Sequence, residues 1–495
     1  MSAADEAGGD RLPCAQRNAQ GFSLSVAARA RTVATVVLGL GLLACLAVLA
    51  HGLYMSSDRS TAMWRHVIPM VGVLVFVLAL RAAPALRVNI AVLVIALGIA
   101  LLALEAVLSV VQRDLYTFRN ALSMHFASAR DVNTLDGRAQ VAAANGVKFD
   151  TRSRLQVVRD LERRGVRSYP SIFPTILMTG DGAGPFLTPR LIIDGIPTLP
   201  FGGISNVTTI LCNESGEYTI YEADEHGFNN PRGIWGREGV QVAAVGDSFT
   251  IGACVPARKG FVDLIRDAYP ATLNLGMDNN GPLTEFAGVR EYLSRVRPRV
   301  VLWFYYEGND LEDLWYEKSA PLLMRYLGDA FSQQLTSRQP AIDAALAAYI
   351  ERSKAGARAP RWKQIVTLFH VREAITRMVR RPDASPPVSR HSVVERDLLR
   401  QILTEARRHI STWGGRLYFV YLPSWDRYAE RPAADRQDVR ALVRELGIPL
   451  IDIDAAFLRA GDPLALFPFR QDGHYNEKGH RLVADAVLRE LPAGL

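Results

Sequence analysis

Three long apolar runs near the N-terminus constrain this chain of 495 residues more than any other feature. The first, residues 32–54, carries no acidic or basic side chain except a histidine, and as a helix it can cross ~30 Å of hydrocarbon. The second covers residues 67–86, and the third covers residues 88–111 with one acidic residue, Glu105. A secretory signal peptide has a shorter apolar core, of ~7–15 residues. The pattern therefore predicts three transmembrane helices within residues 32–112.

Basic residues in the short flanking segments predict the orientation of these helices, because such residues gather on the cytoplasmic side. Residues 1–31 contain four arginines, and Arg81 and Arg87 flank the turn between the second and third runs. Only Arg59 and Arg65 lie between the first and second runs. We expect residues 1–31 to be cytoplasmic and the chain after residue 112 to be periplasmic or extracytoplasmic, in a bacterial inner (plasma) membrane. Failure of one run to cross would invert this orientation.

The composition excludes several classes of protein. The formal charge is +7, yet only six of the 57 basic residues are lysine, and no arginine cluster alternates with aromatic residues. Nucleic acid is therefore not an expected partner. Four cysteines without a CxxC pair exclude a zinc ribbon and a disulfide-dense miniature fold. Cys212 and Cys254 both lie outside in the expected topology, where a disulfide is permitted; two buried thiols are the alternative.

The part of the chain after the apolar runs changes character near residue 240. Residues 113–239 form a mixed leader, with candidate strands at 207–212 and 218–222. From residue 240 to 495, short apolar strands alternate with helical spacing, interrupted by a helical insertion at about 315–393 that is either a lid, a docking surface or a passive excursion. The expected strands are residues 240–245, 272–275, 299–306, 417–422 and 448–453. This alternation predicts an α/β fold, a three-layer α/β/α parallel sheet of flavodoxin-like type behind the membrane anchor and a small β-rich leader.

Polar residues follow several of these strands, at the edge where open α/β sheets bind ligands. Strand 240–245 leads into GDSFT with Ser248, and strand 272–275 leads into the loop 276–281. Strand 299–306 leads into EGND with Asn309, and the last strand leads to DGHYN with Asp472 and His474. A hydroxyl, a Gly/Asn-rich loop, an amide and an Asp–His pair therefore gather at one rim of the sheet.

These blocks resemble the SGNH (GDSL-type) hydrolase family, whose members carry a Ser in a GDS motif, a Gly, an Asn in GxND and a His with a nearby Asp. The resemblance covers roughly residues 240–317 and 394–495. Two departures occur: Gly308 directly precedes Asn309, and Asn279 stands where the family has its loop Gly, with Gly281 two residues on. The Asp is two residues before the His, a spacing found in the polysaccharide-acetylating branch.

The resemblance implies a role for each block. Ser248 is the expected nucleophile, His474 the general base, and Asp472 the acid that orients the imidazole from the loop before the last helix. The expected oxyanion donors are the Ser248 backbone N–H, the Asn309 side chain and a backbone N–H at Asn279 or Gly281. No metal or organic cofactor is expected.

Each block also has a structural interpretation. Ser248 is a plausible helix cap, Asn309 a plausible turn residue, and Asp472 with His474 a plausible pair of metal ligands. Taken together, the blocks favour a membrane-anchored esterase acting on acyl esters, acetyl above all, of a cell-surface or exported polysaccharide. Its expected partners are this substrate, the lipid bilayer and polysaccharide-assembly proteins. A polysaccharide O-acyltransferase with the same triad is the first alternative, and a non-catalytic SGNH-fold scaffold or glycan-binding protein is the second.

Overall fold

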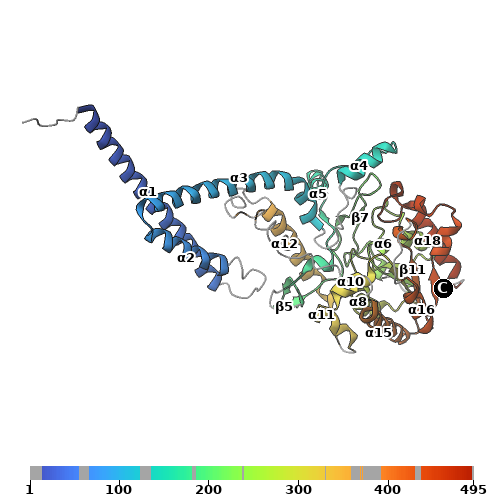
Figure 1. The fold of residues 1–495 in the computed structure, drawn as a ribbon. Coiled ribbons are helices and arrows are strands. Elements are labelled where there is room, and N and C mark those ends of the chain that lie inside the picture. Colours follow the sequence, from blue (N-terminus) through green and yellow to red (C-terminus); the bar gives the residue numbers. More distant parts are fainter. Residues whose placement is uncertain are drawn as a thin grey trace, which may run out of the picture. The chain divides into compact units, whose positions relative to one another are not determined.

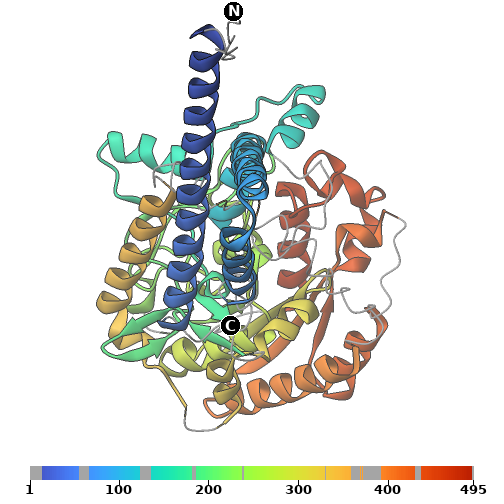
Figure 2. The ribbon, with the colours of Figure 1, turned by 60° about the vertical axis from the view of Figure 1, so that its left-hand side comes forward.

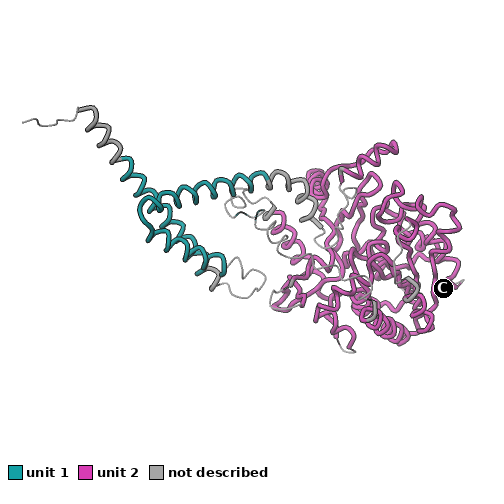
Figure 3. Tube along the Cα trace, in the orientation of Figure 1, with its two compact units in different colours: residues 1–111, 181–184, 360–376 teal, residues 112–180, 185–359, 377–495 magenta. Residues whose placement is uncertain are grey.

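The structure is a computed structural model that describes residues 14–54, 66–122, 135–180, 186–236, 239–328, 331–357, 368, 371, 392–429 and 436–492. The chain divides into two compact units (Figure 3). One consists of residues 1–111, 181–184 and 360–376, and the other of residues 112–180, 185–359 and 377–495. The first unit holds the apolar helices, whereas the second holds both the leader and the sheet.

The apolar unit is built from α1 (Cys14–Tyr54), α2 (Ile68–Arg81) and the part of α3 (Pro84–Leu122) up to Val111. Two stretches, Val26–Ala50 and Pro84–Val107, are long and apolar enough to cross a membrane. Only 11 % of each stretch is buried, which is unlike the core helix of a soluble protein. Helix α2 is equally apolar but has 14 residues, which is about 21 Å of helix. The first and third predicted spans are therefore compatible with an anchor by length and composition, and the second is shorter than a bilayer core.

Helices α1 and α2 pack closely against each other in antiparallel directions. A Cβ placed on Gly41 of α1 would lie 2.5 Å from the Phe76 ring of α2, and one placed on Gly72 of α2 would lie 2.6 Å from the sulfur of Cys45. At the start of α3, Arg87 donates to Thr35 Oγ1 of α1 at 3.4 Å. Helix α2 thus returns the chain to the N-terminal end of the apolar stretch of α1.

The larger unit contains a five-stranded sheet formed by β8 (Val242–Val245), β9 (Thr272–Asn274), β10 (Val300–Tyr306), β11 (Arg416–Leu422) and β12 (Leu450–Asp452). Its order is β12-β11-β10-β8-β9, and every neighbouring pair is parallel. In chain order this is 2-1-3-4-5, the flavodoxin-like arrangement. The predicted parallel sheet is confirmed, with each strand within two residues of its expected limits.

Helices cover both faces of this sheet (Figures 1 and 2), because its strands are apolar on both faces. Val242, Val300 and Val420 point to one face, with α7 (Phe261–Ala268) and α18 (Glu477–Glu490). Ala243, Val301 and Phe419 point to the other, with α8 (Pro282–Gly288), α15 (Ser392–Ser411) and α16 (Arg436–Glu445). The period of two in a strand explains how neighbouring residues enter different cores.

The leader shares the core of one sheet face. Its sheet has the order β1-β6-β7, from β1 (Ser168–Pro170), β6 (Thr208–Ile210) and β7 (Ile220–Glu222), which confirms the two strands expected here. Two small hairpins join β2 (Met178–Gly180) to β3 (Leu187–Pro189) and β4 (Leu191–Ile193) to β5 (Ile196–Thr198). Phe201 and Phe228 belong to the same buried cluster as Trp303 of the central strand. The leader is therefore packed against the main sheet rather than linked to it by a spacer.

Part of the insertion is docked on the leader. Helix α10 (Asp310–Glu317) follows β10, and α12 (Gln339–Ala357) packs beside β4. Asp343 of α12 accepts hydrogen bonds from the Ser205 backbone at 2.9 Å and from its hydroxyl at 2.6 Å. Residues 358–391 of the predicted insertion lie outside the described residues apart from Leu368 and Val371.

Candidate active site

Ser248 stands at a tight turn between β8 and the short helix α6 (Ser248–Ile251). A Cβ on Gly246 would lie 2.1 Å from Thr250 Oγ1, so the turn is too crowded for a side chain there. Asp247 caps α6, accepting the Phe249 N–H at 2.9 Å. Because Asp247 supplies the cap, the Ser248 hydroxyl is not needed for that structural purpose.

His474 reaches this hydroxyl from the loop before α18, as the sequence predicts. Its Nε2 lies 2.9 Å from Ser248 Oγ. The imidazole packs against the Phe249 ring, with 4.8 Å between centroids. Two residues later Asn476 caps α18 through the N–H groups of Lys478 and Gly479, so the position of the loop is set by the start of this helix. The pair has the geometry of a nucleophile and its general base.

The other ring nitrogen of His474 faces Glu214, a leader residue that the sequence analysis did not single out. Its Oε1 lies 3.2 Å from His474 Nδ1, and its Oε2 accepts the His474 backbone N–H at 2.8 Å. Asp472, the residue expected at this position, is exposed, and within the described residues its carboxylate makes no hydrogen bond to His474. The structure thus brings Ser248 and His474 together but not Asp472. The two-residue spacing directs the Asp472 backbone, rather than its side chain, toward this part of the site.

Charges around the imidazole set its protonation. Burial of the His474 ring lowers its pKa, because it disfavours the charged imidazolium. The negative charge of the Glu214 carboxylate, with smaller contributions from Asp278 and Asp247, outweighs the effect of burial and raises the pKa of His474 above 6.5. Burial likewise opposes the charge of Glu214, yet Arg138 and His474 overcome it and lower its pKa to about 2. Burial raises the pKa of Asp247 to about 6. Near neutral pH, Glu214 is therefore a carboxylate that stabilises the imidazolium.

The loop 276–281 packs directly on the nucleophile turn. Met277 donates its N–H to the Gly246 carbonyl at 3.2 Å, and a Cβ on Gly276 would lie 2.3 Å from the Ile251 nitrogen. Gly281 donates its N–H to the Glu317 carboxylate at 2.8 Å. This N–H, one of the two donors expected for the oxyanion hole, is therefore already used in a structural hydrogen bond. The Asn279 N–H has no such partner among the described residues. Of the two backbone N–H groups that the sequence offers as the third oxyanion donor, the geometry favours that of Asn279.

Asn309 follows β10 at the same edge of the sheet. It occupies the N-cap position of α10, yet its side chain makes no capping hydrogen bond. Its Oδ1 is buried without a partner among the described residues. The turn is held instead by Asp310, whose Oδ2 accepts the Tyr306 N–H at 3.0 Å. Within the described part of the chain, the side chain of Asn309 thus has no structural hydrogen bond that would account for its place.

One group in the described part of the chain has the composition of a metal site. Donor atoms of Glu214, Cys254 and His474 lie within 4.8 Å of one another. Cys254, however, is bonded to Cys212, and the thiolate rather than the disulfide sulfur is the metal ligand. The same disulfide settles the question that the sequence left open for these two cysteines.

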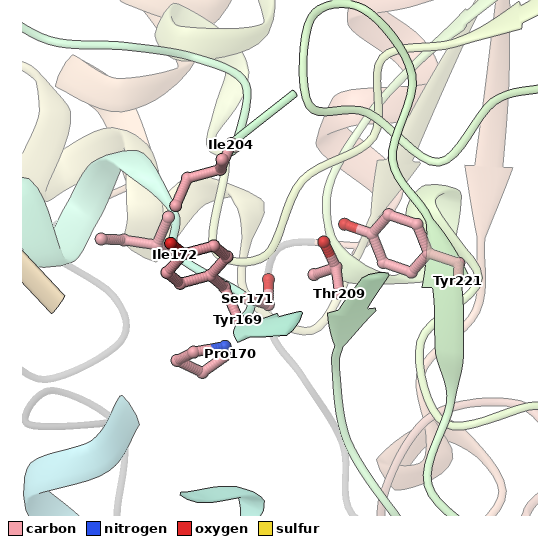
Figure 4. A pocket seen from close by; sticks show the side chains of 8 residues that line it. Tyr169, Pro170, Ser171, Ile172, Ile204, Thr209 and Tyr221 are labelled. Atoms are coloured by element: carbon pink, nitrogen blue, oxygen red, sulfur yellow. The ribbon is translucent and has the colours of Figure 1, made fainter. Parts of the chain in front are cut away.

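A small cavity in the leader is distinct from this site (Figure 4). It lies among Tyr169, Ser171, Ile204, Thr209 and Tyr221, and its volume of about 10 Å³ suits a single water molecule. A substrate cannot occupy it.

Comparison with known proteins finds likeness in solved structures only: no family model matches, and no curated protein gives a significant match. A protein described as lipolytic and of the G-D-S-L family, from Desulfitobacterium hafniense, is 12% identical, with 51% of this chain and 100% of that chain covered and a TM-score of 0.29. A lipase/acylhydrolase from Enterococcus faecalis is 13% identical, with coverage of 50% and 94% and a TM-score of 0.27. An acetyl xylan esterase is 13% identical, with coverage of 51% and 100% and a TM-score of 0.29. At these values the likeness assigns no activity to this chain.

Proposed function

We propose that this chain is a serine ester hydrolase of SGNH type. The observation that carries the proposal is the contact of 2.9 Å between Ser248 Oγ and His474 Nε2 at the carboxyl edge of the parallel sheet. Hydroxyl and imidazole at this distance form the pair that acyl transfer requires. The contact also weighs against a non-catalytic scaffold, for which neither group would need the other.

The reaction follows from the positions of these groups. His474 accepts the hydroxyl proton as Ser248 Oγ attacks the ester carbonyl carbon, giving a tetrahedral oxyanion. The backbone N–H of Ser248 and the Asn309 amide donate to that oxygen, with the Asn279 N–H as the third donor. Collapse of the intermediate breaks the bond to the alcohol, which takes the proton from His474. Water then attacks the acyl-enzyme by the same route and releases the acid.

The location of the enzyme and its substrate class extend this proposal. The apolar helices anchor the chain in a bacterial inner membrane, and the hydrolase-like unit faces outward. There, O-acetyl groups on exported or surface polysaccharide are the esters that an anchored enzyme meets. Support for the outward orientation comes from the arginines at the N-terminal end of α1 and at the α2–α3 turn.

Hydrolysis by the purified full-length protein in detergent tests the proposal. With 4-nitrophenyl acetate and butyrate as probes, we expect turnover that Ser248→Ala abolishes, and labelling of Ser248 by a fluorophosphonate. Equal rates for the wild type and Ser248→Ala would overturn the proposal. Addition of an oligosaccharide distinguishes transfer from hydrolysis, since an O-acyltransferase would acetylate the sugar at the expense of free acetate.

A further inference from the structure

The carboxylate that faces the base of this site comes from the leader. Glu214 contacts His474 twice, with Oε1 3.2 Å from ring Nδ1 and Oε2 2.8 Å from the backbone nitrogen. The backbone contact is a hydrogen bond. The ring contact is an ion-pair distance, because Nδ1 has no partner of hydrogen-bond geometry among the described residues. A carboxylate on Nδ1 keeps the proton there and leaves Nε2 to accept the proton of the nucleophile.

We propose that Glu214, and not Asp472, is the acid that positions His474, so that the leader completes the triad of the hydrolase-like part. This inference rests on the proposed function. The inference adds that residues 113–239 contribute to the catalytic site, although the sequence motifs of the reaction all lie after residue 240.

Two neighbours hold the Glu214 carboxylate in this place. Arg138, which is 8 % exposed, lies 3.3 Å from Oε1 and also donates to the Asp472 carbonyl at 3.0 Å. Gly473 leaves room for the carboxylate, because a Cβ there would lie 2.5 Å from Oε2. The glycine between Asp472 and His474 is thus explained by the approach of Glu214.

A covalent link joins this acid to the segment that carries the nucleophile. Glu214 lies two residues after Cys212, which is bonded to Cys254, and Cys254 lies six residues after Ser248. Ser215 donates to the Cys254 carbonyl at 3.2 Å, and Thr219 donates to the Val255 carbonyl at 2.6 Å. The disulfide and these hydrogen bonds fasten the Glu214 loop to the chain that leaves α6.

A purely structural ion pair with Arg138 is the competing interpretation of Glu214. The two interpretations differ in their effect on the imidazole. The carboxylate is the main group that raises the pKa of His474, so its neutralisation must move the acid limb of the activity profile to lower pH if it acts on the base. Loss of an ion pair elsewhere would lower stability without moving this limb.

The test uses the full-length protein in detergent with 4-nitrophenyl acetate. Glu214→Gln should lower kcat/KM by roughly 10²–10⁴ and shift the acid limb to lower pH. The matched variant Asp472→Asn should stay within about twofold of the wild type and keep its pH profile. Gly473→Ala should also lower kcat, since the new methyl group displaces the carboxylate without removing it.

Further variants keep the result decisive if Glu214→Gln does not fold. Glu214→Asp keeps the charge but shortens the side chain by one methylene, which withdraws Oε1 from both Arg138 and His474 Nδ1. The kcat should therefore fall, whereas the folded population measured by the thermal melt should remain large enough for kinetics. The double variant Cys212→Ala/Cys254→Ala should lower kcat more than it raises KM.

If Asp472→Asn reproduces the loss of activity and Glu214→Asp has wild-type kinetics, the inference about Glu214 is wrong, although the proposed esterase function still stands. If Ser248→Ala retains turnover, the proposed function itself fails.

Discussion

Ser248 and His474 act as one unit in the proposed reaction, and their energetic coupling can be measured. The base has no function without the nucleophile, and the hydroxyl is a weak nucleophile without the base. Ser248→Ala and His474→Ala should therefore each remove nearly all turnover, and the double variant should be little worse than either single variant. Rates of the three purified proteins with 4-nitrophenyl acetate check this. Losses that multiply would show that the residues serve different steps.

Asn309 offers a second test at the residue scale, because its side chain makes no capping hydrogen bond. If its amide donates to the oxyanion, Asn309→Ala should lower kcat by roughly 10²–10³, or about 3–4 kcal/mol of transition-state stabilisation, with little change in KM. A residue that only shapes the turn would instead cost about 1 kcal/mol of folding stability and spare the rate. Kinetics and thermal melts of the same variant separate the two results.

The residues of this site differ in how far sequence could predict them. Ser248 and His474 follow a strand and precede a helix, so local pattern places both at the rim of the sheet. Glu214 lies 260 residues before His474, in a leader loop whose path depends on packing against the sheet. The sequence points to Asp472 because it is near His474 along the chain, and nothing in the sequence singles out Glu214, which is near only in space. The same limit applies to Gly281, whose N–H is taken by Glu317 of α10.

Among the elements, α18 carries a buried histidine that links its packing to pH. His480 is fully buried, and its Nδ1 accepts the Phe261 N–H of α7 at 3.1 Å. Burial, with a smaller contribution from His474, lowers the pKa of His480 to about 3. The neutral ring is therefore favoured in the folded chain, whereas an unfolded histidine binds a proton below pH 6.5.

The sign of the resulting pH dependence follows from linkage. A depressed pKa gives stability that is complete above pH 6.5 and is lost as the pH falls toward 3. His480→Asn keeps an acceptor for Phe261 but cannot titrate. Between pH 6.5 and 4, the free energy of unfolding of the wild type should fall more steeply than that of the variant, by up to about 1.4 kcal/mol per pH unit. Denaturant titrations at several pH values measure both slopes, and parallel slopes would contradict the assignment.

The strands of the main sheet were predictable for a physical reason. A central parallel strand is buried on both faces, so β10 appears as an apolar run of seven residues and β11 as an apolar run of six residues after Arg416. The leader strands have only three residues each. Ile210 of β6 packs against Val157 and Val158 of α5 (Arg154–Arg163), whereas Tyr221 of β7 belongs to the cluster on one face of the main sheet. Local pattern therefore located β6 and β7 but not their place against the sheet.

For the whole molecule, the side of the membrane depends on whether α2 crosses. An even number of crossings would leave the hydrolase-like unit on the side of the N-terminus. Helix α2 has only 14 residues, but it runs antiparallel along α1 from Cys45 to Gly41. In the first turn of α3, Arg87 then contacts Thr35 of α1. A short helix can span by local thinning of the bilayer, at a cost of fractions of a kcal/mol per Å of mismatch.

Reporter fusions test directly whether the number of membrane crossings is odd or even. The arginines at the N-terminal end of α1 and at the α2–α3 turn lie at one end of the helical hairpin, which favours a cytoplasmic position for both. Alkaline phosphatase, which is active only outside the cytoplasm, should be inactive when fused after Ala83 and active when fused after Gly239. A cytoplasmic fluorescent reporter at the same two positions should give the opposite pattern. An active phosphatase at Ala83 with an inactive one at Gly239 would place the proposed esterase inside the cell, where surface polysaccharide cannot be its substrate.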